Sequence, residues 1–166
     1  EKTTVAHIKD VKFLGYGFYF NKNGCGIRTH RKSVEKMRAK IRELTSRGNG
    51  WGNERRKEAL RQYITGWLNY FRLADMKNLL EKTDEWFRRR IRSLIWKQWK
   101  RIKTKLRNLI KLGIPKQKAR AFANTRKGYW RIADSPILHR SITNDRLRAS
   151  GYIFFSDYYY KIRCVN

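Results

Sequence analysis

The sequence predicts a mainly α-helical protein with an N-terminal β-hairpin, a bundle of three helices and a small, mostly helical basic region. Three observations support this fold class. Residues 11–20 are aromatic and β-prone. Apolar residues recur at helical spacing over most of residues 31–112. Glycine, proline and other turn residues interrupt that pattern over residues 113–166. We therefore divide the chain into residues 1–30, 31–112 and 113–166.

The first region contains a candidate hairpin. The aromatic segment at residues 11–20, with the sequence VKFLGYGFYF, is followed by turn-forming residues at 21–24 and a short segment at 25–28. This pattern predicts two strands joined by a tight turn. Because a two-stranded hairpin alone is marginally stable in water, we expect it to pack against another part of the protein.

The middle region predicts three helices. The first begins at Arg31 and ends at the Gly-Asn-Gly sequence of residues 48–50. The second runs from Asn53, its N-cap, to about residue 73, and its apolar residues cover roughly half of its circumference. The third begins near residue 75, has a second candidate N-cap at Thr83 and continues toward residue 112, before Gly-Ile-Pro stops it. We expect four residues of the second helix to be buried in the bundle: Leu60, Ile64, Trp67 and Phe71.

The last region has a less regular pattern. It predicts a short basic helix at residues 117–124, a turn at 134–136 and one further helix at 137–149 that Gly151 ends. The tail after Gly151 is too aromatic to be a free end. We expect it to pack back on the domain, as either a strand or a helix.

The composition indicates a folded protein with a polyanionic partner. Lysine and arginine number 41 against 13 aspartate and glutamate residues, which gives a net charge of +28. Hydrophobic residues make up 40% of the chain, enough for a core, which excludes a disordered basic tail. Because so much like charge repels itself, we expect a nucleic acid as the partner, with an anionic membrane surface as the weaker alternative. No apolar run approaches the roughly 18 residues of a membrane-spanning helix.

The positive charge is concentrated in residues 86–133, which include 17 lysine and arginine residues and no aspartate or glutamate. An ordinary solvated helix mixes both signs, whereas this stretch cannot form a single internal ion pair. On a helical wheel for residues 86–111, apolar residues take one face and cations fill the rest. The stretch therefore predicts a surface that follows a phosphate backbone. The candidate RNA- or DNA-binding residues are Arg88, Arg89, Arg90, Arg92, Trp96, Lys97, Lys100, Arg101, Lys103, Arg107, Lys116, Lys118, Arg120, Arg126, Lys127 and Arg131.

Trp96 lies on the cationic side of this wheel, and two interpretations are open. Its ring could stack on a base or a sugar between phosphate contacts. Alternatively, it could pack against the region that follows.

The sequence predicts no catalytic residue, no metal ligand and no cofactor on this chain. Asp84 and Glu85 are the only adjacent acids, and the dipole of a helix that starts there explains them without catalysis. The histidines are scattered, and Cys25 and Cys164 lie far apart, so we expect reduced, metal-free thiols.

Several segments, in this order, resemble the C-terminal part of bacterial group II intron-encoded reverse transcriptases. FLGYGF at residues 13–18 is similar to the primer-grip strand that ends their palm. The segments that resemble their maturase-specific, or thumb, domain are SVEKM at 33–37, ITGWLNYF at 64–71, DEWFRRRIR at 84–92 and WKQWK at 96–100. The segments that resemble the DNA-binding region after the thumb are GYWRIA at 128–133 and SPIL at 135–138, together with Asn144, Leu147 and Gly151-Tyr152.

The resemblance implies a protein that binds its own intron RNA, assists splicing and primes reverse transcription at a DNA target. It implies that residues 1–30 end the palm, 31–112 form the thumb and 113–166 form the DNA-binding region. The primer-positioning residues by resemblance are Phe13, Leu14 and Gly15. Implied partners are group II intron RNA, target DNA and the finger and palm part of the same protein, without a membrane. The implied location is the bacterial cytoplasm, with association to the nucleoid when target DNA is bound.

The resemblance is incomplete in ways that bear on activity. The finger and palm regions with the Tyr-Ala-Asp-Asp-type strand are missing from this chain, as is a His-Asn-His endonuclease domain. The Mg²⁺ of a polymerase site would therefore belong to the missing part, and we expect this chain alone neither to polymerise nor to cut DNA. Because the first residue is Glu1 rather than Met, we expect a processed product or a fragment.

Two other functions remain open. A free-standing nucleic-acid-binding module or splicing factor without a polymerase partner would also explain the charge and the absent chemistry. A module for protein interactions would use the aromatic residues of the second helix and the tyrosine-rich tail.

Overall fold

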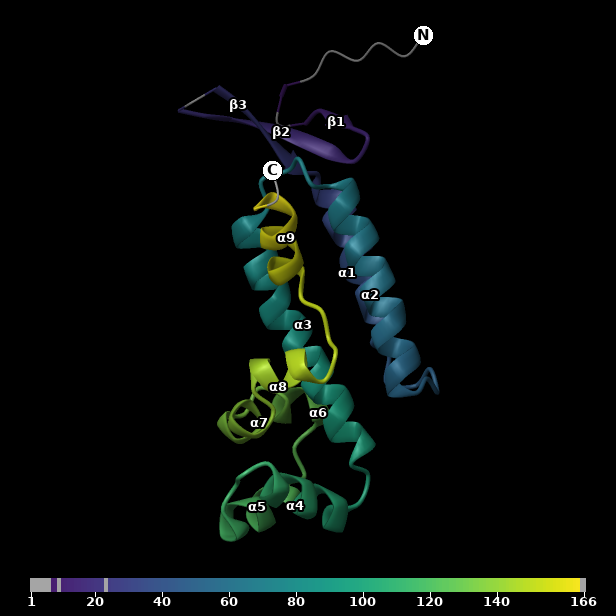
Figure 1. Ribbon diagram of the computed structural model, residues 1–166, viewed down its shortest axis with the longest axis vertical. Coiled ribbons are helices and arrows are strands. Elements are labelled where there is room, and N and C mark those ends of the chain that lie inside the picture. The colour runs from purple at the N-terminus through teal and green to yellow at the C-terminus, as the bar shows by residue number, and fades with distance from the viewer. Residues whose placement is uncertain (1–6, 9, 23, 165–166) are drawn as a thin grey trace.

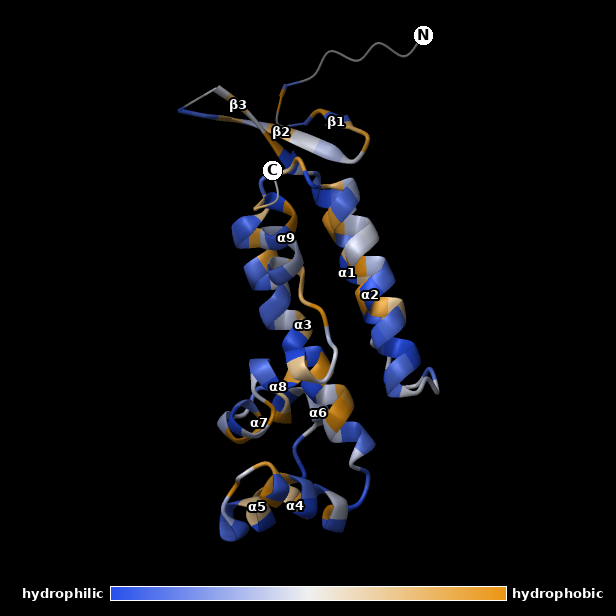
Figure 2. Cartoon of the chain, in the orientation of Figure 1, coloured by the Kyte–Doolittle hydropathy of each residue, from blue (hydrophilic) through white to orange (hydrophobic). Residues whose placement is uncertain are grey.

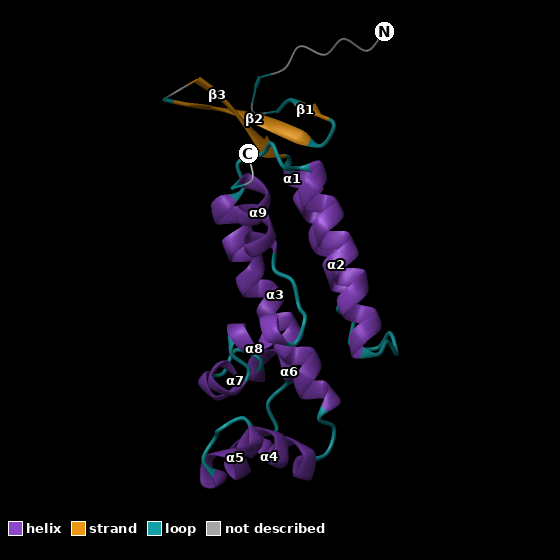
Figure 3. Ribbon diagram, in the orientation of Figure 1, coloured by secondary structure: helices purple, strands orange, loops and turns teal. Residues whose placement is uncertain are grey.

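The computed structural model describes residues 7–8, 10–22 and 24–164 (Figure 1). Glu1 and Asn23, which belongs to the predicted hairpin turn, lie outside the described residues. The elements are β1 (Lys12–Phe13), β2 (Tyr16–Asn21), β3 (Gly24–Thr29), α1 (Arg31–Leu44), α2 (Asn53–Tyr70), α3 (Lys77–Gln98), α4 (Ile102–Lys111), α5 (Lys116–Ala123), α6 (Tyr129–Ile132), α7 (Pro136–Ser141), α8 (Asn144–Ala149) and α9 (Phe155–Arg163). The protein is mainly helical with an N-terminal antiparallel sheet, which confirms the predicted fold class (Figure 3).

The sheet has three strands in the order β1-β2-β3, where the sequence pattern predicted two. The predicted first strand divides because Leu14 and Gly15 form a two-residue turn between the paired residues Phe13 and Tyr16. Both turn residues have positive φ, 48° and 85°, as the tight turn of a right-twisted hairpin requires. A Cβ on Gly15 would lie 3.0 Å from Ser33 Oγ, so this glycine is also a point of close approach.

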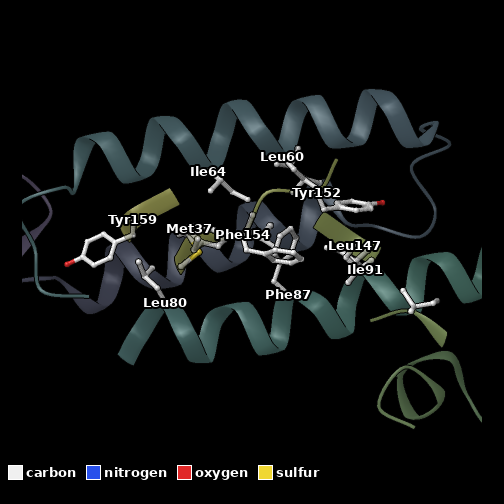
Figure 4. Packing of buried hydrophobic residues seen from close by; sticks show 14 of the residues in the cluster. Met37, Leu60, Ile64, Leu80, Phe87, Ile91, Leu147, Tyr152, Phe154 and Tyr159 are labelled. Carbon is white, nitrogen blue, oxygen red and sulfur yellow. The ribbon is translucent and has the colours of Figure 1, made fainter. Parts of the chain in front are cut away.

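Helices α1, α2 and α3 pack around the hydrophobic core (Figures 1 and 4). Leu60, Ile64 and Phe71 of the α2 region are buried, as predicted. Trp67 is half-buried, and its ring lies 4.8 Å from that of Phe71 and 6.0 Å from that of Phe155, measured between ring centroids. The helical stripe therefore contacts two neighbours, one of which is the C-terminal tail.

The tail is a helix, α9, that packs beside α3 (Figure 1). Asp84 in the middle of α3 accepts hydrogen bonds from the first amides of α9, at 2.9 Å from Phe155 N and 2.8 Å from Ser156 N. Tyr159 is buried and donates its hydroxyl to the Ala74 carbonyl at 2.9 Å. The core is thus continuous across residues 112 and 113, where the sequence pattern changes.

The predicted third helix is two helices, because α3 ends at Gln98 and α4 begins at Ile102. Trp99, at the end of α3, has a ψ of 55° and leaves the helical conformation. The turn brings the helices after it back toward Trp96, whose ring lies 5.6 Å from that of Phe122 in α5. A straight helix would carry α4 away from these apolar partners.

The predicted helix at residues 137–149 is also divided, into α7 and α8. Ile142 is buried with a ψ of 75°, and the Thr143 side chain accepts a hydrogen bond from Arg146 N as the N-cap of α8. A threonine whose hydroxyl caps a new helix competes with continuation of the old one. Gly151 ends α8, as predicted.

Candidate nucleic-acid interface

The cations of α3 hold neighbouring elements together. Arg90 donates to Thr45 Oγ1 at 2.6 Å and to the Arg42 carbonyl at 3.3 Å, at the C-terminal end of α1. Lys97 donates to the Arg47 carbonyl just beyond it, at 2.7 Å. Carbonyls at a helix C-terminus lack intrahelical partners and attract cations. These side chains therefore stabilise the bundle, although the sequence pattern assigned them to a binding surface.

Arg89 and Arg92 have the same role toward the following helices. Arg89 donates to the Trp130 carbonyl at 3.1 Å and pairs with Asp134 at 3.1 Å. Arg92 is 5% exposed and donates to the Ile142 carbonyl and to Asn144 Oδ1, each at 2.9 Å. A guanidinium buried among these acceptors cannot reach a phosphate backbone on the surface.

Burial affects the electrostatics of these arginines. It lowers the pKa of Arg92, and Arg88 lowers that pKa further, while Asp134 raises it. Burial lowers the pKa of Arg90 as well, and Arg42 and Arg47 add to the effect. Because a free guanidinium stays protonated far above neutral pH, both side chains remain charged. Arg88 is half-buried, with its guanidinium 5.6 Å from the centre of the Phe154 ring.

Trp96 is 1% exposed, which decides between its two interpretations. Its ring packs against those of Trp99 and Phe122, and the Lys105 ammonium lies 4.8 Å from its centre. No face is left on which a base could stack. The assignment of Trp96 as a base-stacking residue was wrong, because the turn after α3 folds α4 and α5 over a ring that a straight helix would expose.

The candidate residues after Trp99 are exposed. Among the described residues, none of them makes an ion pair. Figure 2 shows hydrophilic residues on α4 and α5, at the end of the molecule farthest from the sheet. We call this set the distal cations: Lys100, Arg101, Lys103, Arg107, Lys116, Lys118, Arg120, Arg126, Lys127 and Arg131.

A tight turn between α4 and α5 positions the distal cations. Gly113 has a φ of 92°, and its N–H bonds to the Ile110 carbonyl at 2.9 Å. The next amide, of Ile114, bonds to the Leu109 carbonyl at 3.0 Å, which completes a Schellman motif. The two helices bury Leu109, Ile114 and Ala119 between them, so the polar sides of both helices face outward.

Two exposed aromatic residues in α6 were not among the sequence-based candidates. Tyr129 is 40% exposed and Trp130 is 39% exposed. The Arg47 guanidinium lies 5.3 Å from the Tyr129 ring centre, and that of Arg89 lies 4.3 Å from the Trp130 ring centre. The sequence does contain a signal for them, because two adjacent aromatic residues lie inside the acid-free stretch of residues 86–133.

The β1–β2 turn presents the primer-grip-like residues. Phe13 is 63% exposed and Leu14 is 66% exposed. The Leu14 carbonyl accepts from Tyr70 Oη at 2.9 Å, and the Gly15 carbonyl accepts from Ser33 Oγ at 2.9 Å. A left-handed backbone at a leucine costs about 1–2 kcal/mol, and these bonds hold it in place. The turn is thus a fixed tip with two apolar side chains facing solvent.

Asp84 has a structural role in the described part of the chain. Asp84 is fully buried, and burial raises its pKa, which its hydrogen bonds from Ser156 and Phe155 and the charge of Arg88 partly offset. It caps α9 and does not lie at the start of its own helix, which corrects the sequence-based explanation. Within the described ranges, no three His, Cys, Asp or Glu side chains come together as a metal site.

A hollow of about 610 Å³ lies where α3 meets the short helices α6–α8. It has both charges, because Arg89 pairs with Asp134 at 3.1 Å and Arg148 pairs with Asp145 at 3.0 Å. Burial and the charge of Arg92 lower the pKa of His139 at its edge, which Asp134 partly offsets. Paired charges of this kind stabilise packing and leave little net field for an anion.

Comparison with known proteins finds a family whose model is similar to part of the helical body. In the described ranges, no helix combines the length and apolar character needed to cross a membrane. None of the curated proteins matches the chain. Residues 34–113, just under half of the sequence, match the model of the family "Group II intron, maturase-specific domain". The matched range covers most of α1, all of α2, α3 and α4, and the Gly113 turn, and supports a role in group II intron splicing. Residues 34–113 are thus similar to a group II intron maturase-specific domain, as the sequence motifs predicted.

Proposed function

We propose that this chain binds group II intron RNA through the distal cations and so assists splicing. One observation carries the proposal: the distal cations are exposed and have no acidic partner among the described residues. Unpaired surface cations on a folded protein bind polyanions because phosphate contacts release condensed counterions. Because residues 34–113 match the model of a maturase-specific domain, we propose intron RNA as this polyanion.

We further propose that the chain works as part of an intron-encoded reverse transcriptase in the bacterial cytoplasm. Its exposed tip at Phe13 and Leu14 would position a primer, and the cations after residue 113 would contact target DNA during intron mobility. The finger and palm part would supply the polymerase site with its Mg²⁺. The aromatic residue Phe20, 71% exposed on β2, supports a partner that covers the sheet.

Salt dependence of RNA binding tests the proposal. A variant with Lys100, Lys103, Arg107 and Lys118 changed to glutamine removes four distal cations. If each contacts one phosphate, the slope of log K against log salt flattens by about three units. The matched control changes four exposed lysines near the sheet, Lys32, Lys36, Lys77 and Lys82, to glutamine. It carries the same charge change, and we expect its slope to flatten by less than about one unit.

Competition separates specific from generic binding. A folded group II intron RNA should outcompete bulk transfer RNA, because shape must supply the preference that charge cannot. Equal flattening in both variants, or equal competition by both RNAs, would reduce the protein to a general polyanion binder. A free-standing module would bind the intron RNA equally well with and without a finger and palm part. Adding that part in trans therefore distinguishes a free-standing module from a part of a reverse transcriptase. Binding that persists unchanged at high salt would instead favour a protein-interaction module.

A further inference from the structure

Helix α6 presents two adjacent aromatic side chains on a fixed support. Tyr129 and Trp130 remain 40% and 39% exposed, while Ile132 and Ala133 beside them are buried. The Trp130 carbonyl accepts two hydrogen bonds from Arg89, at 3.2 and 3.1 Å. The support is therefore held to α3, and the rings need no rearrangement to meet a ligand.

Each ring has a cation beside it. The Arg89 guanidinium lies 4.3 Å from the centre of the Trp130 ring, and the Arg47 guanidinium lies 5.3 Å from that of Tyr129. Such a cation is attracted to the ring and restricts its motion. The acid beside this group, Asp134, is paired with Arg89 at 3.1 Å.

The neighbouring surface continues the charge. Arg126 and Lys127 precede α6, and Arg131 lies in it. All three are exposed and make no ion pair among the described residues. Exposed aromatic rings between unpaired cations are the combination by which proteins hold unpaired nucleotides. A duplex keeps its bases stacked on each other and offers no face to such rings.

We propose that Tyr129 and Trp130 stack on unpaired nucleobases of the bound nucleic acid, with the flanking cations on its backbone. The inference rests on the proposed function and assigns to these two residues the role that Trp96, being buried, does not have. The recognised chemistry is an unpaired nucleobase joined to phosphates, in RNA or in DNA. The residues thus add a preference for single-stranded segments to the general attraction of the distal cations.

Oligonucleotides that differ only in their bases test the proposal on the full chain. The probes are an unstructured RNA of about 16 nucleotides, its duplex, and a strand of the same length with an abasic stretch, so that phosphate charge is matched. Trp130→Leu should weaken binding of the unstructured strand by about 5- to 150-fold. It should change binding of the duplex and the abasic strand by less than about twofold. Trp130→Phe should restore part of the loss, since phenylalanine keeps a ring.

Matched controls separate stacking from other effects. Tyr160→Leu removes a ring with the same exposure, 39%, on α9, and should leave all affinities unchanged. If Trp130→Leu does not fold, Tyr129→Leu takes its place in the same comparison. DNA versions of the three probes show whether the base is taken from RNA, from DNA or from both.

Each outcome has a distinct meaning. Equal wild-type affinity for the base-containing and abasic strands, or the same loss in the variant for all probes, would overturn the stacking proposal while the proposed function stands. If the wild type binds none of the probes and no intron RNA, the proposed function itself fails.

Discussion

Single arginine residues in this chain have different roles that depend on which acceptors reach them. Arg92 is buried on the Ile142 carbonyl and Asn144, whereas Arg107, fifteen positions later, is exposed and unpaired among the described residues. Removing a buried, hydrogen-bonded charge destabilises a fold, while removing an exposed charge weakens only what it binds. A substitution of a hydrogen-bonded arginine in α3 should therefore lower the stability of the fold. A loss of nucleic-acid binding in such a variant would not show that this arginine contacts the nucleic acid.

Asp84 provides a prediction at the residue scale. Asp84→Ala leaves the Phe155 and Ser156 amides at the start of α9 without their acceptor, and should lower the free energy of unfolding by about 1–3 kcal/mol. The exposed neighbour substitution Glu85→Ala is the control and should change it by less than about 0.5 kcal/mol. Urea denaturation measures both values.

The pH dependence of this penalty follows from the pKa of Asp84, which burial raises above the ordinary aspartate value. A group whose pKa is higher in the folded protein contributes most below its unfolded pKa, and the contribution is lost as pH rises through the folded pKa. The penalty of Asp84→Ala should therefore be larger near about pH 4 than near about pH 7. A penalty that grows with pH would show that the hydrogen bonds outweigh burial.

At the scale of elements, helix ends determine where the charged surfaces lie. The three turns that the sequence pattern did not predict occur at Leu14-Gly15, Trp99 and Ile142. The turns at Trp99 and Ile142 place apolar side chains against a partner. The Leu14-Gly15 turn instead leaves the side chains of Phe13 and Leu14 exposed. The α4–α5 pair depends on one further turn, at Gly113, which the sequence did predict.

Two glycine substitutions should have opposite effects. Gly113→Ala places a Cβ on a residue with a φ of 92° and should cost about 1–2 kcal/mol, although no atom lies within 4 Å of that Cβ. Gly66→Ala, inside α2 and equally free of contacts, should stabilise the protein by about 0.5–1 kcal/mol. Thermal unfolding compares them. Hydrogen exchange should locate the loss in Gly113→Ala to α4 and α5, and a uniform loss would contradict this explanation.

At the scale of the molecule, the sheet and the α4–α5 pair lie at opposite ends of a helical body (Figure 1). One hydrophobic cluster includes residues from α1 through α9, so the C-terminal helix completes the bundle that begins with α1. The two ends are therefore connected through a common core rather than through a linker between separate domains.

The continuous core predicts a single unfolding transition. Phe155→Ala removes a fully buried ring that lies against those of Trp67 and Phe87, and should cost about 3–5 kcal/mol. Tryptophan fluorescence and far-UV circular dichroism should report the same, lowered midpoint for the whole chain. Leu73→Ala, at a residue 64% exposed, is the control and should leave the midpoint nearly unchanged. Two separate transitions would show that the C-terminal part unfolds independently.

The sequence alone determined the mainly helical class, the similarity of residues 34–113 to a maturase-specific domain, the burial of Leu60, Ile64 and Phe71, and the concentration of positive charge. These properties follow from composition, helical periodicity and short motifs, which depend on residues close together in the chain. The tertiary structure decided which cations are free, that Trp96 is buried, that Tyr129 and Trp130 are exposed and that the tail is a helix. The physical reason is that the partners come from far along the chain: the carbonyl that binds Arg92 lies 50 residues later, and the amide that Asp84 caps lies 71 residues later.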